Sequence, residues 1–177
     1  MRRCSSLLGT IDGLTEVVQQ QRQLDEAPVE AVALQPFTEE VIRGLPQLPG
    51  QPEAEFTLDF AALPSLRLPR TALQSVLYNL LSNALKYAEP GRAPRIAVRT
   101  ALVEGTPVLS VQDNGRGIDL KRYGGELFQL FRRFHPEVAG SGVGLYLVNR
   151  LVKQVGGRVE VDSVVGEGTT FRVFLPQ

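Results

Sequence analysis

Asn79, Asn83 and Lys86 are the residues whose types and spacing most directly suggest chemistry. They follow one another at i, i+4 and i+7, so a helix would place two amides and one ammonium group on a single face, within reach of one ligand. Neutral amide oxygens can hold a magnesium ion that also keeps water and phosphate oxygens. A solvated helix face would produce the same three residues, so this segment alone leaves both interpretations open.

The second candidate cluster is Asp113-Asn-Gly115-Arg-Gly117-Ile118, directly after an expected strand. Glycine lets a backbone turn and approach a planar ring closely. An ionised aspartate only accepts hydrogen bonds, so Asp113 could take the amino group of adenine and would repel the carbonyl oxygen of guanine. A D-N-G turn at the end of a hairpin would be the better explanation if the cluster stood alone.

Two more glycine clusters follow in the second half of the chain, Gly140-Ser-Gly142-Val143-Gly144-Leu145 and Gly166-Glu-Gly168-Thr169-Thr170-Phe171. The first precedes an expected helix, whose free amides and positive dipole end suit a phosphate. A dinucleotide-binding fold would need G-x-G-x-x-G directly after a strand, and a phosphate-binding P-loop would need G-K-[ST]. Neither pattern is present, so both of these nucleotide folds are disfavoured.

The asparagine helix and the three glycine clusters, in this order, resemble the catalytic, ATP-binding domain of sensor histidine kinases. Those kinases share their nucleotide fold with the gyrase B subunit, one class of heat-shock chaperones and the mismatch-repair ATPases. The resemblance covers roughly residues 30–177. It implies ATP and Mg²⁺ as cofactors, with the metal on Asn79 and Asn83, the phosphates near Lys86 and the adenine amino group on Asp113.

The same resemblance implies the rest of the nucleotide-binding residues. Thr169 would reach the adenine through its hydroxyl or through a water. Tyr87, Ile118 and Leu145 would line the adenine pocket, although each of them could equally be an ordinary core residue. The other residues implied to bind the cofactor are Gly115, Gly117, Gly140, Gly142, Val143 and Gly144.

A mobile lid over the nucleotide is implied for residues 119–139, where Leu127, Phe128 and Phe131 are expected around a helical turn. Arg132 and Arg133 are candidates for clamping the transferred phosphate, and Arg133 matches the lid arginine of the family better. Solvated surface charges would explain both arginines equally well. The catalytic set implied by the resemblance is Asn79, Asn83, Lys86 and Arg133.

Asn79 also distinguishes between reactions. The gyrase and chaperone relatives carry a glutamate at this position as the general base for ATP hydrolysis, and an amide cannot take a proton from water. Asn79 therefore favours phosphoryl transfer to a protein acceptor. His135, followed by Pro136, is the single histidine of the chain and fits a lid residue better than a phosphate acceptor, so the acceptor histidine is expected outside this chain.

Bulk composition limits the other functional classes. The 177 residues carry 19 basic and 19 acidic side chains, so the zero net charge gives no reason to expect nucleic acid or anionic lipid as a partner. One cysteine, Cys4, precludes an intrachain disulfide and a cysteine-based zinc site. Neither a signal peptide nor a transmembrane segment is expected.

The first 27 residues are expected to form a separate unit. Leu7, Ile11, Leu14 and Val18 form a two-heptad apolar seam, which predicts a helix over residues 5–25. By the resemblance, residues 1–27 are the end of the second helix of a dimerisation hairpin, and residues 28–177 are the catalytic domain.

Hydrophobic periodicity and turn residues predict the elements that position these clusters. The expected class is α+β, a two-layer sandwich in which helices cover one face of a mixed sheet. Strands are expected at residues 29–34, 55–60, 66–68, 95–103, 108–113, 158–163 and 170–175, and helices at 36–45, 70–88 and 142–155.

The sequence therefore predicts the ATP-binding catalytic domain of a two-component sensor histidine kinase, in the cytoplasm. Its expected partners are the phosphoacceptor hairpin of the same parent kinase and a downstream response regulator receiver domain. The parent kinase is expected to be a homodimer. No direct membrane contact is expected for this segment. An ATPase of the gyrase or chaperone type, or a degenerate nucleotide-binding interaction module, is the alternative.

Overall fold

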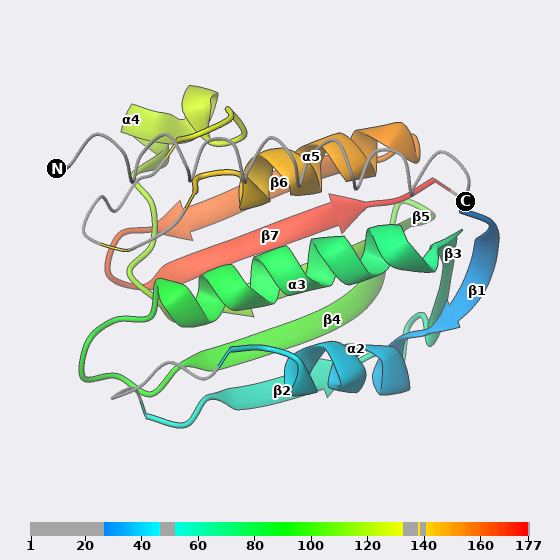
Figure 1. Ribbon diagram of the computed structural model, residues 1–177, viewed down its shortest axis with the longest axis horizontal. Helices are drawn as coiled ribbons and strands as arrows, with labels where there is room; N and C mark the ends of the chain where they lie inside the picture. The colour runs from blue at the N-terminus through cyan, green and yellow to red at the C-terminus, as the bar shows by residue number, and fades with distance from the viewer. Residues whose placement is uncertain (1–26, 47–51, 133–137, 139–140, 177) are drawn as a thin grey trace, which may run out of the picture.

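Five strands form the main sheet, in the order β2-β4-β5-β7-β6, in a computed structural model that describes residues 27–46, 52–132, 138 and 141–176 (Figure 1). β2 pairs with β4 in parallel, and the other three pairs are antiparallel. The sheet is therefore mixed, as predicted. The strands are β2 (Glu55–Asp59), β4 (Arg95–Val103), β5 (Thr106–Asp113), β6 (Arg158–Val164) and β7 (Gly168–Phe174).

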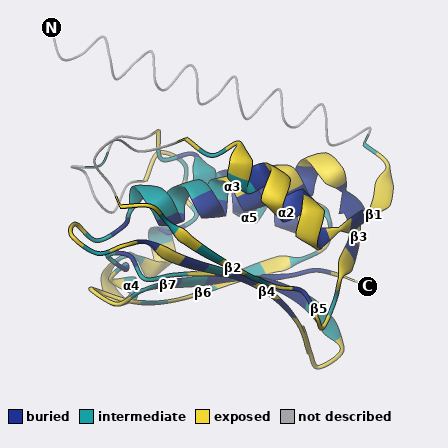
Figure 2. Cartoon of the chain, turned by 90° about the horizontal axis from the view of Figure 1, so that it is seen from below, coloured by how far each residue is buried: buried dark blue, intermediate teal, exposed yellow. Residues whose placement is uncertain are grey.

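Three helices lie on the same face of this sheet, α2 (Leu34–Arg43), α3 (Arg70–Lys86) and α5 (Gly144–Gln154) (Figure 2). The two-layer α+β class predicted from the sequence is thereby confirmed. The predicted helix over residues 5–25, and with it the unit assigned to residues 1–27, lies outside the described residues. None of the described helices has the length and apolar character needed to cross a membrane.

The central helix α3 owes its place to a continuous apolar stripe. The residues predicted to face the core recur at steps of three and four, and most of them are at most 5% exposed, whereas Leu85 is only partly buried. Because the stripe contacts the sheet and neighbouring helices, α3 is held along its whole length. The buried members of the predicted stripe are Leu73, Val76, Leu77, Leu80, Leu81 and Ala84.

The short strands β1 (Val29–Ala33) and β3 (Ser65–Pro69) pair with each other in a second, two-stranded antiparallel sheet. The sequence predicted both strands but not this separate pairing, because periodicity identifies a strand without identifying its partner. The β4–β5 turn also differs from the prediction of four residues. It contains only Glu104 and Gly105, both with positive φ, a backbone twist that suits tight hairpins.

The segment after Asp119 departs from the sequence prediction in the position of its helical turn. The turn consists of α4 (Leu120–Tyr123) and the 3₁₀ helix Gly124–Glu126, which precede Leu127, Phe128 and Phe131 instead of containing them. The Asp119 side chain accepts a hydrogen bond from Arg122 N at 3.1 Å, which caps the turn at its start. Leu127 is buried, while Phe131 is 39% exposed.

Replacing Leu77 by alanine should lower the free energy of unfolding by about 2–5 kcal/mol, because this fully buried side chain would leave a cavity between α3 and the sheet. Gln74→Ala, on the exposed side of the same helix, should change it by less than about 0.5 kcal/mol. Urea unfolding followed by circular dichroism measures both. Equal losses in the two variants would contradict the assignment of the stripe to the core.

Candidate functional site

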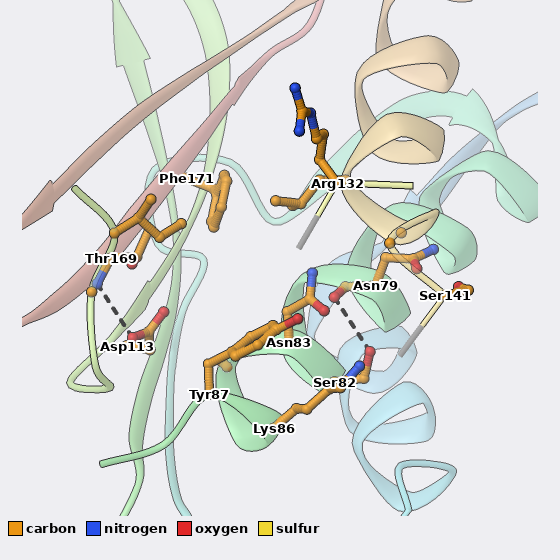
Figure 3. Close-up of a pocket in the computed structure, with 16 residues that line it drawn as sticks. Asn79, Ser82, Asn83, Lys86, Tyr87, Asp113, Arg132, Ser141, Thr169 and Phe171 are labelled. Atoms are coloured by element: carbon orange, nitrogen blue, oxygen red, sulfur yellow. Dashed lines mark hydrogen bonds between the residues drawn. The ribbon is translucent and has the colours of Figure 1, made fainter. Parts of the chain in front are cut away.

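One cavity lies between α3, the loop after β5, the start of α5 and the start of β7 (Figure 3). Figure 3 shows Asp113 and Thr169 on one side, and Asn79, Asn83 and Lys86 of α3 on the other. Residues from positions 79 to 169 thus share one site. Of the predicted site residues, the cavity is lined by Asn79, Asn83, Lys86, Tyr87, Asp113, Gly117, Ile118, Gly142, Gly144, Leu145 and Thr169.

Two other predicted site residues, Gly115 and Val143, do not line the cavity. Gly115 lies behind it, where its amide donates a hydrogen bond to Asp113. Val143 is buried next to Leu147, in a small cluster of its own. Arg133 and Gly140 lie outside the described residues, so their roles stay predictions.

The polar face of α3 has a defined orientation at Asn79. The side-chain amide nitrogen of Asn79 donates to Ser75 O at 2.8 Å, and since a carbonyl only accepts, the Asn79 Oδ1 atom must face the other way. It faces α5: a Cβ atom added to Gly144 would lie only 2.7 Å from Oδ1. Gly144 therefore lets the start of α5 approach the asparagine helix.

The two charged groups nearest to the asparagines differ in their surroundings. Lys86 Nζ lies 5.5 Å from the centroid of the Tyr87 ring, a distance at which a cation is attracted to the ring face. Arg132 also lines the cavity, but its guanidinium forms an ion pair with Glu126, at 2.9 Å between Nη2 and Oε2. Arg132 Nη2 would have to leave Glu126 before that nitrogen could bind a phosphate.

Asp113, at the end of β5, accepts two backbone hydrogen bonds through one oxygen. Gly115 N donates to Oδ1 at 2.8 Å and Thr169 N donates to the same atom at 3.2 Å. Burial raises the pKa of the Asp113 carboxyl above its usual 3.8, and the two amide hydrogen bonds partly offset that rise. Because both bonds use Oδ1, the other oxygen, Oδ2, is available as an acceptor for a ligand.

Gly117 is required by the packing of two loops. Its φ is +68°, and a Cβ atom there would lie 2.1 Å from Val164 O, at the end of β6. The sequence interpretation had given this glycine the role of admitting a planar ring. The structure adds a different reason, since the absent side chain makes room for backbone.

Sequence reasoning missed several residues of the cavity wall. Ser82 precedes Asn83 on α3, so its place in the asparagine motif could have identified it as a cavity residue. Ser141 and Phe171 belong to the glycine clusters, but sequence reasoning assigned neither of them a role. Ser163, which does not line the cavity but contacts Thr169, which does, gave no local signal. It lies next to Thr169 on the neighbouring strand, and its Oγ accepts a hydrogen bond from Ile118 N at 2.8 Å.

The raised pKa of Asp113 predicts a specific pH dependence of stability. The folded state binds this proton more tightly than the unfolded chain, so ionising the carboxyl destabilises the fold. The stability of the wild type relative to Asp113→Asn should therefore fall as the pH rises from below 3.8 through the raised pKa, and should level off above it. Urea unfolding of both proteins across this range measures the difference. A difference that grows in favour of the wild type would mean that the two amides outweigh burial.

Comparison with known proteins agrees with this geometry. Residues 69–177, more than half of the chain, match the family model of histidine kinase-, DNA gyrase B-, and HSP90-like ATPases. The methanogenesis regulatory histidine kinase FilI of Methanothrix harundinacea is 37% identical over 113 residues, which are 64% of this chain and 13% of that kinase. The sensor histidine kinase GraS of Staphylococcus epidermidis is 35% identical over 128 residues, 69% of this chain and 35% of that kinase.

Solved structures have the same architecture. The mycobacterial sensor histidine kinase MprB superposes with a TM-score of 0.67 at 27% identity, over 84% of this chain and 97% of that one. Full-length ShkA, solved in complex with AMPPNP, gives 0.75 at 22% identity, over 96% of this chain and 35% of that one, and supports the fold. The chain belongs to the histidine kinase-, DNA gyrase B- and HSP90-like ATPase family, and its described part is the ATP-binding catalytic domain of a sensor histidine kinase.

Proposed function

We propose that this chain binds ATP with Mg²⁺ and transfers the γ-phosphoryl group to a histidine outside the chain. The observation that carries the proposal is the cavity in which Asn79, Asn83 and Lys86 face Asp113. One wall offers amide oxygens and an ammonium group, which suit a metal and phosphates, and the opposite wall offers a carboxylate, which suits an amino group. A nucleoside triphosphate with an adenine base carries metal-binding phosphates at one end and an amino group at the other.

Base recognition would depend on Asp113. Its Oδ1 atom is taken by two backbone amides, so Oδ2 would accept a hydrogen bond from the exocyclic amino group of adenine. A guanine in the same position would present a carbonyl oxygen to that carboxylate, and two acceptors repel each other. The site should therefore select ATP over GTP.

The donor set of the opposite wall fits magnesium. The described residues include no group of three His, Cys, Asp or Glu side chains that could hold a metal by themselves, so most ligands would be amide oxygens, waters and phosphate oxygens. Asn83 is the first candidate ligand, and Asn79 could contribute Oδ1, since its nitrogen is committed to Ser75. When bound, the metal would neutralise charge on the β- and γ-phosphates. Lys86 would add a compact positive charge beside them.

Asn79 favours transfer over hydrolysis. Its amide cannot act as a general base toward water, and its NH₂ group is a hydrogen-bond donor to Ser75 O. The relatives FilI and GraS are named histidine kinases, which also supports phosphoryl transfer over hydrolysis. The chain spans only 13% and 35% of those two kinases, so the acceptor would be supplied by another part of the parent protein.

The remaining partners follow from this assignment. We propose that the acceptor histidine is on a helical hairpin of the parent kinase, that the parent is a homodimer, and that a response regulator receiver domain takes the phosphoryl group next. The reaction would take place in the cytoplasm, where ATP is available. His135 lies outside the described residues and would not be the acceptor.

Asn83→Ala should weaken magnesium-dependent ATP binding by at least about tenfold, or about 1.4 kcal/mol, without changing the fold. The reason is that the change removes a metal ligand from a partly exposed position of α3 and leaves no buried cavity. Isothermal titration with and without magnesium measures the effect. Asn149→Ala, on α5 and away from the cavity, is the matched control. An unchanged affinity in Asn83→Ala would remove this residue from the site.

The proposed reaction is tested by supplying the acceptor. Incubated alone with radiolabelled ATP, the chain should bind the nucleotide but neither label itself nor release phosphate at an appreciable rate. After addition of the phosphoacceptor hairpin of its parent protein, acid-labile label should appear on the hairpin, slowly because no tether raises its effective concentration. The Asn83→Ala chain should fail in the same tube.

Each alternative predicts a different result in this experiment. Rapid release of free phosphate from the chain alone would indicate an ATPase of the gyrase or chaperone type. Nucleotide binding with no label on the hairpin would indicate a degenerate nucleotide-binding interaction module.

A further inference from the structure

Ser163 and Thr169 form a pair of hydroxyls behind the adenine end of the cavity. They are register partners on β6 and β7, with their oxygens 2.8 Å apart. Thr169 lines the cavity and is 7% exposed, whereas Ser163 does not line it. Ser163 Oγ is also 2.8 Å from Ile118 N and 2.9 Å from Gly168 O. One serine hydroxyl thus has three polar neighbours of different kinds.

The number of available protons decides which group donates to which. The Ile118 amide can only donate, so Ser163 Oγ accepts from it; the Gly168 carbonyl can only accept, so the single Ser163 proton points to it. The proton between the two hydroxyls must then come from Thr169. All three short contacts are hydrogen bonds at once only in this arrangement. If Ser163 donated to Thr169 instead, its contact with Gly168 O would hold two acceptors.

The consequence for Thr169 is a fixed polarity. Its one proton is used on Ser163, so toward the cavity its oxygen offers lone pairs only. The backbone amide of the same residue donates to Asp113 Oδ1, which leaves Asp113 Oδ2 as the second acceptor on this side. The two side chains that meet the base would therefore both be acceptors.

We propose that Ser163 is a specificity-determining positioning residue, which holds the Thr169 hydroxyl as a hydrogen-bond acceptor and so selects a purine with an amino group at C6 over one with a carbonyl. This inference rests on the proposed binding of ATP. Ser163 does not touch the base and acts only through Thr169. Without Ser163, the Thr169 hydroxyl is free to rotate and donate, and a C6 carbonyl then finds a partner.

The test compares ATP with inosine triphosphate, which replaces the C6 amino group of adenine by a carbonyl and the N1 acceptor by an N–H donor, and leaves the sugar and phosphates unchanged. Affinities of the full chain for both nucleotides are measured with magnesium by isothermal titration. In Ser163→Ala the preference for ATP over inosine triphosphate should shrink by about fivefold or more, the usual value of one hydrogen bond. If Ser163 had only a structural role, the substitution would lower the affinities for both nucleotides alike and leave the ratio of the two affinities unchanged.

Three further variants separate the proposed relay from other effects. Ser110→Ala removes a serine hydroxyl from β5 that bonds Arg99 O, away from the cavity, and should keep the wild-type ratio. Thr169→Val should shrink the ratio of the affinities for ATP and inosine triphosphate as Ser163→Ala does, and Thr169→Ser should preserve this ratio. The double variant Ser163→Ala/Thr169→Val should shrink the ratio no further than Thr169→Val alone, because Ser163 acts only through the Thr169 hydroxyl, which valine lacks.

The outcomes distinguish this inference from the proposed function. If the wild type prefers ATP and Ser163→Ala keeps the full preference, the positioning role is overturned while ATP binding stands. If Ser163→Ala does not fold, a Thr169→Val ratio equal to that of the wild type overturns the inference equally. If the wild type binds neither nucleotide, the proposed function fails and the inference fails with it.

Discussion

The binding cavity depends on the two amide hydrogen bonds to Asp113 Oδ1. They come from two separate segments of the chain, Gly115 two residues after Asp113 and Thr169 at the start of β7. A buried carboxylate is unfavourable unless its charge is solvated by donors, and these two amides supply part of that solvation. β5 and β7 are already paired up to Gln112 and Thr170, and the bond from Thr169 N continues this connection to the side chain of Asp113. The carboxylate that would bind the base is therefore tied to both strands.

Behind Asp113 the wall is built from backbone instead of side chains. Arg116 N donates to Tyr87 O at 3.0 Å, and Gly166 N donates to Arg116 O at 2.8 Å. The Arg92 side chain in turn donates to Gly166 O at 2.9 Å. Three loops far apart in the sequence are thereby joined by hydrogen bonds, so the loop that follows Asp113 is positioned by its neighbours. This is how a glycine-rich loop can hold an accurately placed acceptor.

Helix α3 joins stability and binding in one element. One of its stripes is core, and the adjacent face carries Asn79, Asn83 and Lys86 into the cavity. The contact between Asn79 and Gly144 then sets the position of α5 relative to those polar groups. A change on the buried stripe would therefore move the polar face with it, whereas a change at Asn83 would act on the ligand alone.

The sequence by itself determined what is local. The step of three and four from Leu73 to Ala84 is a property of one helix, so it predicted α3, its buried stripe and the shared face of Asn79, Asn83 and Lys86. The mixed α+β class also followed, since each strand and helix carries its own period. Only the tertiary structure decided the contacts between distant segments, such as Asp113 with Thr169, Gly117 with Val164 and Ser163 with Ile118. Those contacts depend on strand order and loop packing. Sequences with the same periodicity could adopt a different strand order, because periodicity specifies which face of an element is buried and not which element covers it.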